Sequence, residues 1–355
     1  MILSFITSIT GLLAGSAIPA DELDRSRLPA DVDVVLHLDI EGLRRTQLWR
    51  FVESNEEFNL EISELDQFRT RFGIDLLNDV RSATVYKTKD EEQPTVAILR
   101  VAPSVDEAIR KMQAEAKTMD GYRSIEKSGI TLHSWGDPDD EDDSAYAFVH
   151  PLPDGDRLVV VASKAENAVR AARVIRGEAE NLGRVRDPAL RVQPAPGSFF
   201  YLSAVEFPGL GAEFTPASQV FGLAQGIQLD LGEAGGFLQA HVSVVTAGPE
   251  EAQSVAAVIN GVIGLGNLAS FQLGEAAEMV QGVLRSLRVN AVDSEVTLDF
   301  QYSVSALLST IQAIEEATQS EELDEDAEEA EEQEEEVKVE KRVERRDGRR
   351  EHRGD

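Results

Sequence analysis

Short apolar runs with a period of two recur along this chain, and turn residues separate them. Residues 32–39 read VDVVLHLD and show the pattern first. Because successive side chains of a strand point to opposite faces, Leu36 and Leu38 are expected to face a core. His37 and Asp39 share the other side, which is expected to face water. The spacing therefore predicts a half-buried strand and a solvated His–Asp pair.

Turn signals between such runs predict hairpins, and hairpins pair antiparallel. The strand-like runs VRSATVYK and TVAILRV flank the polar loop KDEEQP, and an Asp-Gly dipeptide at 154–155 joins two more. Helical periodicity covers 104–118 and 163–176, and Ser163 with Glu166 matches a capping box. The pattern predicts an α+β fold in which a mainly antiparallel sheet carries helices on one face and leaves the other partly wet.

The same order of segments returns in the second half of the chain. Residues 245–258 (VTAGPEEAQSVAAV) align with residues 101–112 (VAPSVDEAIRKM), after a similar strand and hairpin in each case. Between the halves, residues 179–197 are rich in proline and glycine, which is typical of a linker. We therefore predict two related α+β halves, residues 28–178 and 198–318.

The two ends of the chain differ from these halves. Residues 1–20 carry no charged side chain and end in small residues before DELDRSR, which predicts a secretory signal peptide. The alternative is an uncleaved N-terminal membrane anchor. Residues 321–336 hold twelve acidic side chains in sixteen positions, and a basic stretch follows. Such charge blocks bury too little apolar surface to fold, so residues 319–355 are predicted to be a disordered acidic-then-basic tail.

Charge and the lack of cysteine exclude several kinds of function. The formal net charge is −31, from 65 acidic and 34 basic residues. This field repels nucleic acid and favours cationic partners and divalent ions. The absence of cysteine removes thiol nucleophiles, disulfides, CxxC redox motifs and cysteine-ligated metals. We expect no nucleic-acid partner and no stable membrane insertion after signal removal, while the tail allows a cationic or envelope partner.

A search for catalytic motifs predicts no catalytic residue, no cofactor-binding residue and no cofactor. His37 and Asp39 fit a strand edge better than a general base with its carboxylate. GLGNLA at 264–269 has the letters of a dinucleotide fingerprint, but it follows a helical run, so we interpret it as the glycine-rich end of that helix.

The run DPDDEDD is the sharpest local candidate for a metal site. It lies at residues 137–143 and lacks the glycine and glutamate that an EF-hand needs at positions six and twelve. A solvated hairpin tip fits it better than a calcium loop. The candidate ligands are Asp137, Asp139, Glu141 and Asp143.

Four segments together resemble a known group of proteins. They are LPADVDVVLHLD, FGIDLLNDVRSATVY, PTVAILRV and DGDRLVVVASKAENAVRAARVIRG. The chain resembles large uncharacterised families of exported bacterial proteins that are abundant in planctomycetes, over residues 28–180 and more faintly over 196–318. The resemblance implies an extracytoplasmic α+β protein and identifies no catalytic residue.

Three classes of function remain. The sequence favours an exported, periplasmic or extracellular, non-catalytic protein with a structural or ligand-binding role. The first alternative is a hydrolase whose carboxylates do not stand out among so many acidic residues. The second is a divalent-cation-binding or scaffold protein that acts through its acidic surface and tail.

Overall fold

The computed structural model describes residues 23–54, 75–89, 96–115, 122–136, 144–185, 190, 192, 194–205, 222–270 and 277–311. The predicted signal peptide, the acidic run at 137–143 and the predicted tail lie outside the described residues. The chain divides into two units, Met1–Val304 and Ser305–Asp355. In the second unit the described residues, 305–311, are helical. Everything below concerns the first unit.

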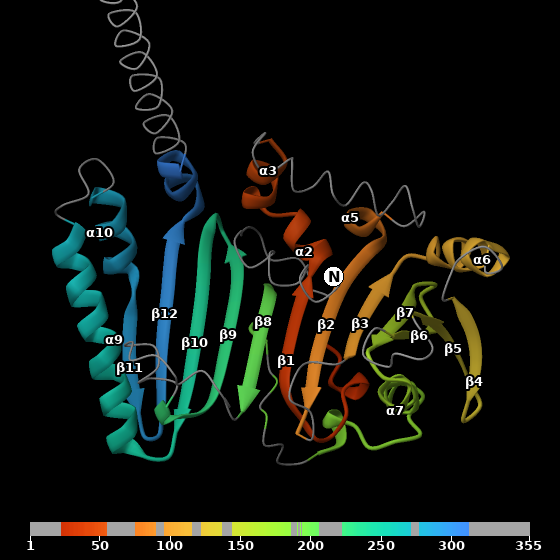
Figure 1. Ribbon diagram of the computed structural model, residues 1–355. Helices are drawn as coiled ribbons and strands as arrows, with labels where there is room; N and C mark the ends of the chain where they lie inside the picture. The colour runs from red at the N-terminus through yellow and green to blue at the C-terminus, as the bar shows by residue number, and fades with distance from the viewer. Residues whose placement is uncertain are drawn as a thin grey trace, which may run out of the picture. The chain divides into compact units, whose positions relative to one another are not determined.

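Twelve strands form one sheet, and every neighbouring pair is antiparallel. The strands are β1 (Val32–Asp39), β2 (Val80–Thr88), β3 (Val96–Val101), β4 (Arg123–Lys127), β5 (Ile130–Trp135), β6 (Ala145–Pro151), β7 (Arg157–Ala162), β8 (Ser198–Val205), β9 (Ala224–Ala234), β10 (Phe237–Thr246), β11 (Arg288–Val292) and β12 (Glu295–Ser303). Their order across the sheet is β11-β12-β10-β9-β8-β1-β2-β3-β7-β6-β5-β4 (Figure 1).

Helices connect the strands and cover the sheet. They are η1 (Arg25–Arg27), α2 (Ile40–Arg44), α3 (Gln47–Ser54), α5 (Leu76–Asp79), α6 (Val105–Glu115), α7 (Ala165–Ile175), η3 (Leu182–Arg184), α9 (Pro249–Ser270) and α10 (Ala277–Ser286). The α+β class with a mainly antiparallel sheet is confirmed.

The strand order explains how the two halves join. β1 pairs with β8 at the centre, and each is followed outward by a hairpin, β2-β3 on one side and β9-β10 on the other. Each hairpin then leads into a helix, α6 or α9. The described strands of both halves therefore form one continuous sheet. The domain boundaries stay a prediction.

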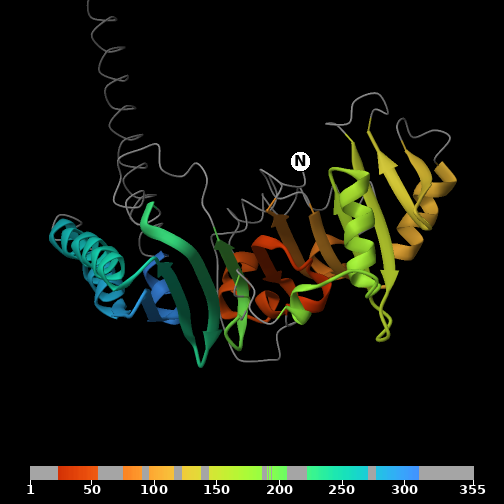
Figure 2. The same ribbon diagram turned by 90° about the horizontal axis from the view of Figure 1, so that it is seen from below.

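Helices lie on both faces of the first half and on one face of the second. α7 packs on the face of β1 that carries Val35, in a core with Tyr86, Ile98 and Val160. α2 and α6 pack on the opposite face, with Val101 (Figure 2). In the second half, α9 packs on the same face as α2. None of the described helices packs on the other face of β9, β10 and β12.

One local expectation from the sequence is wrong. α7 begins at Ala165, and its N-cap residue is Lys164, without a capping side chain. Glu166 forms an ion pair with Lys127 of β4 instead of a capping box with Ser163. The GLGNLA segment forms the last turns of α9, which ends at Ser270, so its interpretation as a helix end is confirmed.

The glycines in this part of α9 have a packing role. A Cβ at Gly266 would lie 3.2 Å from Leu284 Cδ1 of α10, so the glycine permits close contact between the two helices. By length and composition alone, α9 is the one described helix that is apolar enough to cross a membrane, and only 11% of its apolar window is buried.

Candidate functional site

His37 and Asp39 are buried, which corrects the expectation that they face water. Their residues are 4% and 2% exposed. β1 lies in the middle of the sheet, between β2 and β8, and the segment with Leu23 and Leu28 covers the His37 side together with α7. The period of two was correct, but a central strand in a sheet covered on both sides leaves neither face to solvent.

The two side chains have separate structural partners. His37 Nδ1 lies 2.8 Å from Thr84 Oγ1 of β2. An Asp39 carboxylate oxygen accepts a hydrogen bond of 2.8 Å from the Gly42 backbone N–H and so caps α2. These contacts give both side chains a structural role.

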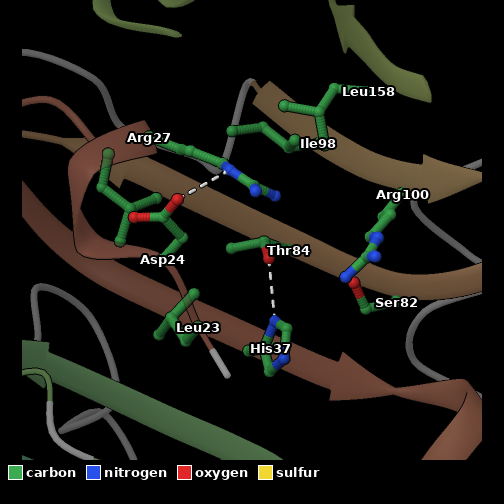
Figure 3. A pocket seen from close by; sticks show the side chains of 10 residues that line it. Leu23, Asp24, Arg27, His37, Ser82, Thr84, Ile98, Arg100 and Leu158 are labelled. Carbon is green, nitrogen blue, oxygen red and sulfur yellow. Dashed lines mark hydrogen bonds and ion pairs between the residues drawn. The ribbon is translucent and has the colours of Figure 1, made fainter. Parts of the chain in front are cut away.

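The cavity beside His37 is too small for a substrate. Its volume is about 20 Å³, enough for about one water molecule. Figure 3 shows the Asp24–Arg27 ion pair, of 2.9 Å, closing one side. The residues that line it are Leu23, Asp24, Arg27, Leu28, His37, Ser82, Thr84, Ile98, Arg100 and Leu158. We interpret this region as a polar part of the core.

A larger groove, of about 550 Å³, lies along β9, β10 and β12 in the second half. The residues around it are Ala195, Pro196, Gly197, Ser198, Asp230, Gly232, Glu233, Ala234, Phe237, Gln239, Ala240, His241, Arg285, Ser286, Arg288, Asp299, Phe300 and Gln301. Its volume is within the usual range of small-molecule sites. We call it the second-half groove.

Charged side chains form one lateral row across this groove. The strand register places Asp230 opposite His241, His241 opposite Asp299, and Asp299 opposite Arg288. Directly opposed side chains of neighbouring strands point to the same face. The row therefore alternates acid, imidazole, acid and guanidinium, and it lies on the face that none of the described helices covers.

His241 and Asp299 form the closest pair of the row. Nδ1 of the imidazole lies 2.7 Å from a carboxylate oxygen, and both side chains are partly exposed. A carboxylate on Nδ1 fixes the ring and its tautomer, as in hydrolase triads. Among the described residues, no serine or threonine hydroxyl is hydrogen-bonded to His241. The pair can accept or donate a proton, but it has no nucleophile partner there.

Asp230 is buried and helps to hold one wall of the groove. One carboxylate oxygen accepts hydrogen bonds from the Ala195 backbone N–H (2.8 Å) and from Ser198 Oγ (3.2 Å). The wall segment also needs Gly232, because a Cβ there would lie 2.7 Å from the Gly197 carbonyl oxygen. The end of the predicted linker and the start of β8, residues 195–198, are thereby fixed against β9.

Glu233 does not belong to the charged row, although the residue borders the groove. By alternation its side chain points to the helix-covered face of β9, the face of Leu231. The residue is 4% exposed, and neither carboxylate oxygen has a hydrogen-bond partner among the described residues. Burial raises its pKa to about 7, and Arg50 acts in the opposite direction. The carboxyl is therefore costly to ionise.

The sequence search did not single out His241, Asp230 or Asp299. The available signal was the alternation of polar residues in QLDLGEA, LQAHVSV and TLDFQY, which marks a wet sheet face. Among the described residues, no cluster of three metal-ligating side chains occurs. The candidate ligands Asp137, Asp139, Glu141 and Asp143 lie outside the described residues, so the metal hypothesis stays a prediction.

Comparisons with known proteins add little to this geometry. No family model matches the chain, and no curated protein matches it. Solved structures of one protein, TP0453, are distantly similar. Crystal form III has 13% identity and a TM-score of 0.41, covering 82% of this chain and 99% of the neighbour. Crystal form IV has 13% identity, a TM-score of 0.37 and coverages of 83% and 97%. At these values the likeness carries no argument about function.

Proposed function

We propose that this chain is an exported, non-catalytic binding protein whose ligand occupies the second-half groove. The observation that carries the proposal is the row of Asp230, His241, Asp299 and Arg288 in a groove of about 550 Å³, on a sheet face that none of the described helices covers. A few polar groups that converge in a concave site are typical of ligand recognition.

The groove's chemistry favours a neutral, polyhydroxylated ligand such as a glycan. Asp299 would repel an anionic ligand and Arg288 would repel a cationic one, because these two side chains lie side by side. A hydroxyl both donates and accepts, so it can pair with a carboxylate, a guanidinium or the amides of Gln239 and Gln301. The ring of Phe237, which is 42% exposed, offers an apolar surface at the end of the groove.

Removing the groove's central polar groups is expected to weaken glycan binding. In isothermal titration calorimetry against a panel of soluble oligosaccharides, Gln239→Ala/His241→Ala should lower the affinity about tenfold or more, because a buried polar contact to a ligand is lost. His150→Ala, a matched change on β6, should leave it within about twofold. If no oligosaccharide binds, or if the groove variant binds as the wild type does, the proposal fails.

A hydrolase is the second candidate, and the 2.7 Å His241–Asp299 contact is the observation that favours it. Chromatography of each bound oligosaccharide after long incubation distinguishes the two functions, because only a hydrolase yields shorter products. A cation-binding or scaffold role is tested by adding Ca²⁺ in a thermal-shift measurement.

Export is the cellular part of the proposal, and the uncharged leader at 1–20 supports it. Membership of the planctomycete-type exported family is proposed on the four sequence segments alone. We expect protein from its native host to begin after residue 20, because a signal peptidase removes such leaders. N-terminal sequencing measures this directly, and soluble protein that still begins at Met1 would exclude a cleaved signal.

A further inference from the structure

The outward side of α9 is unusually apolar for a helix that faces water. Val262, Leu265 and Leu268 are 46%, 66% and 68% exposed, the largest such cluster among the described residues. From Ala252 to Ser270 the helix carries no charged side chain. The surface helices of soluble proteins place polar or charged residues on this side, so the exposed cluster indicates an interaction surface.

α9 is held on the sheet by its other side. Ala252 and Val255 are buried against Val244 of β10 and Val296 of β12. Near the far end, Gly266 packs against Leu284 of α10. The opposite side of α9 is already packed in the core. The exposed leucines are therefore not needed to hold the helix on the sheet.

The residues on the outward side of α9 change from polar to apolar along the helix. In the first two turns it carries Glu250, Gln253 and Ser254, all exposed. From the third turn on it carries small and apolar residues with Asn260 among them, and we call this part the α9 apolar face. It consists of Ala257, Gly261, Val262, Gly264, Leu265 and Leu268. Charge is thus confined to one end of the helix.

We infer that the α9 apolar face docks on the surface of a lipid bilayer whose zwitterionic headgroups carry no net charge. A stable protein interface buries roughly 800 Å² on each partner, and three partly exposed side chains supply far less. A bilayer requires no such area or matching shape, because each inserted apolar side chain contributes by itself. The net charge of −31 opposes anionic lipids, which leaves neutral headgroups.

This inference does not depend on the glycan proposal, since α9 packs on the sheet face opposite the charged row. It concerns attachment at the interface by one side of a helix, not a membrane-spanning segment.

Flotation with phosphatidylcholine vesicles tests the inference on the full chain. The wild type should float with the vesicles, and Leu265→Glu/Leu268→Glu should lower the bound fraction about tenfold or more. Gln253→Glu/Ser254→Glu adds the same charge to the polar end of α9 and should stay within about twofold of the wild type. All three proteins carry the same residues 1–20, so a difference between them reports on α9.

The contrary outcomes are distinct. If the wild type does not float, or if the double-leucine variant floats equally well, the lipid inference is wrong. If light scattering shows a wild-type dimer that this variant dissociates, the face binds a second copy instead. Should the variant not fold, as judged by its circular dichroism, Leu265→Trp replaces it: brominated phosphatidylcholine should quench the added fluorescence, and unchanged emission overturns the inference.

Discussion

Replacing Lys87 by methionine is expected to lower the free energy of unfolding by about 3–5 kcal/mol. Lys87 Nζ of β2 lies 2.9 Å from a carboxylate oxygen of Asp33 in β1, and both side chains are buried. The other Asp33 oxygen has no hydrogen-bond partner among the described residues. Methionine keeps most of the aliphatic chain but leaves the Asp33 charge buried without its cation, and this unpaired charge causes the loss.

Urea denaturation of the single and double variants measures this effect. Asp33→Leu/Lys87→Met should regain most of the lost stability, because replacing both charges removes the desolvation cost of each. Arg170→Met is the matched control: its ion pair with Asp31 is exposed, so the change should be below about 1 kcal/mol. Equal losses for Lys87→Met and Arg170→Met would show that burial of the Asp33–Lys87 pair has no energetic consequence.

Glu233→Gln is expected to stabilise the protein above neutral pH, by an amount on the order of 1–3 kcal/mol. Burial raises the folded-state pKa of Glu233 to about 7, whereas an unfolded glutamate titrates near about 4.3. Between these values the folded state binds the extra proton, so the wild type loses stability as pH rises from about 4.3 to about 7. Glutamine resembles the protonated acid and has no such loss.

The difference in unfolding free energy between Glu233→Gln and wild type, measured by denaturant titration at several pH values, gives the test. It should be near zero at pH 4, increase up to about pH 7 and stay constant above it. Glu107→Gln, on the exposed side of α6, should show almost no pH-dependent difference. A variant that is destabilised more at pH 8 than at pH 4 would indicate that the Glu233 carboxylate has a stabilising partner, and a difference that does not change with pH would contradict the raised pKa.

Local sequence signals predicted the hairpins correctly. The β2-β3 and β6-β7 pairs form where turn residues separate two strand-like runs, and Gly155 has the positive φ of 101° that such a turn needs. Hairpin formation depends on neighbouring residues and on backbone conformation, both of which are visible in the sequence. Strand β4 was missed because RSIEK is mostly polar and lies at the sheet edge, where burial imposes little pattern.

The candidate site was not predictable to the same degree. His37 stood out because it follows a strongly apolar run, yet the structure buries it beside Thr84. His241 and Asp299 are 58 residues apart along the chain, and only the register of β10 with β12 brings them to 2.7 Å. Their alternation with apolar neighbours indicated a wet face, but it gave no reason to pair these two residues.

The sequence by itself determined the hairpins and the α+β class, because these follow from periodicity and turn chemistry over short stretches. Only the tertiary structure decided which strand faces are covered. α7 lies over the His37 side of the sheet, whereas the Asp230–His241–Asp299 row has none of the described helices on it. Burial depends on contacts between distant segments, and a period of two in a strand is the same whether one face or both are covered.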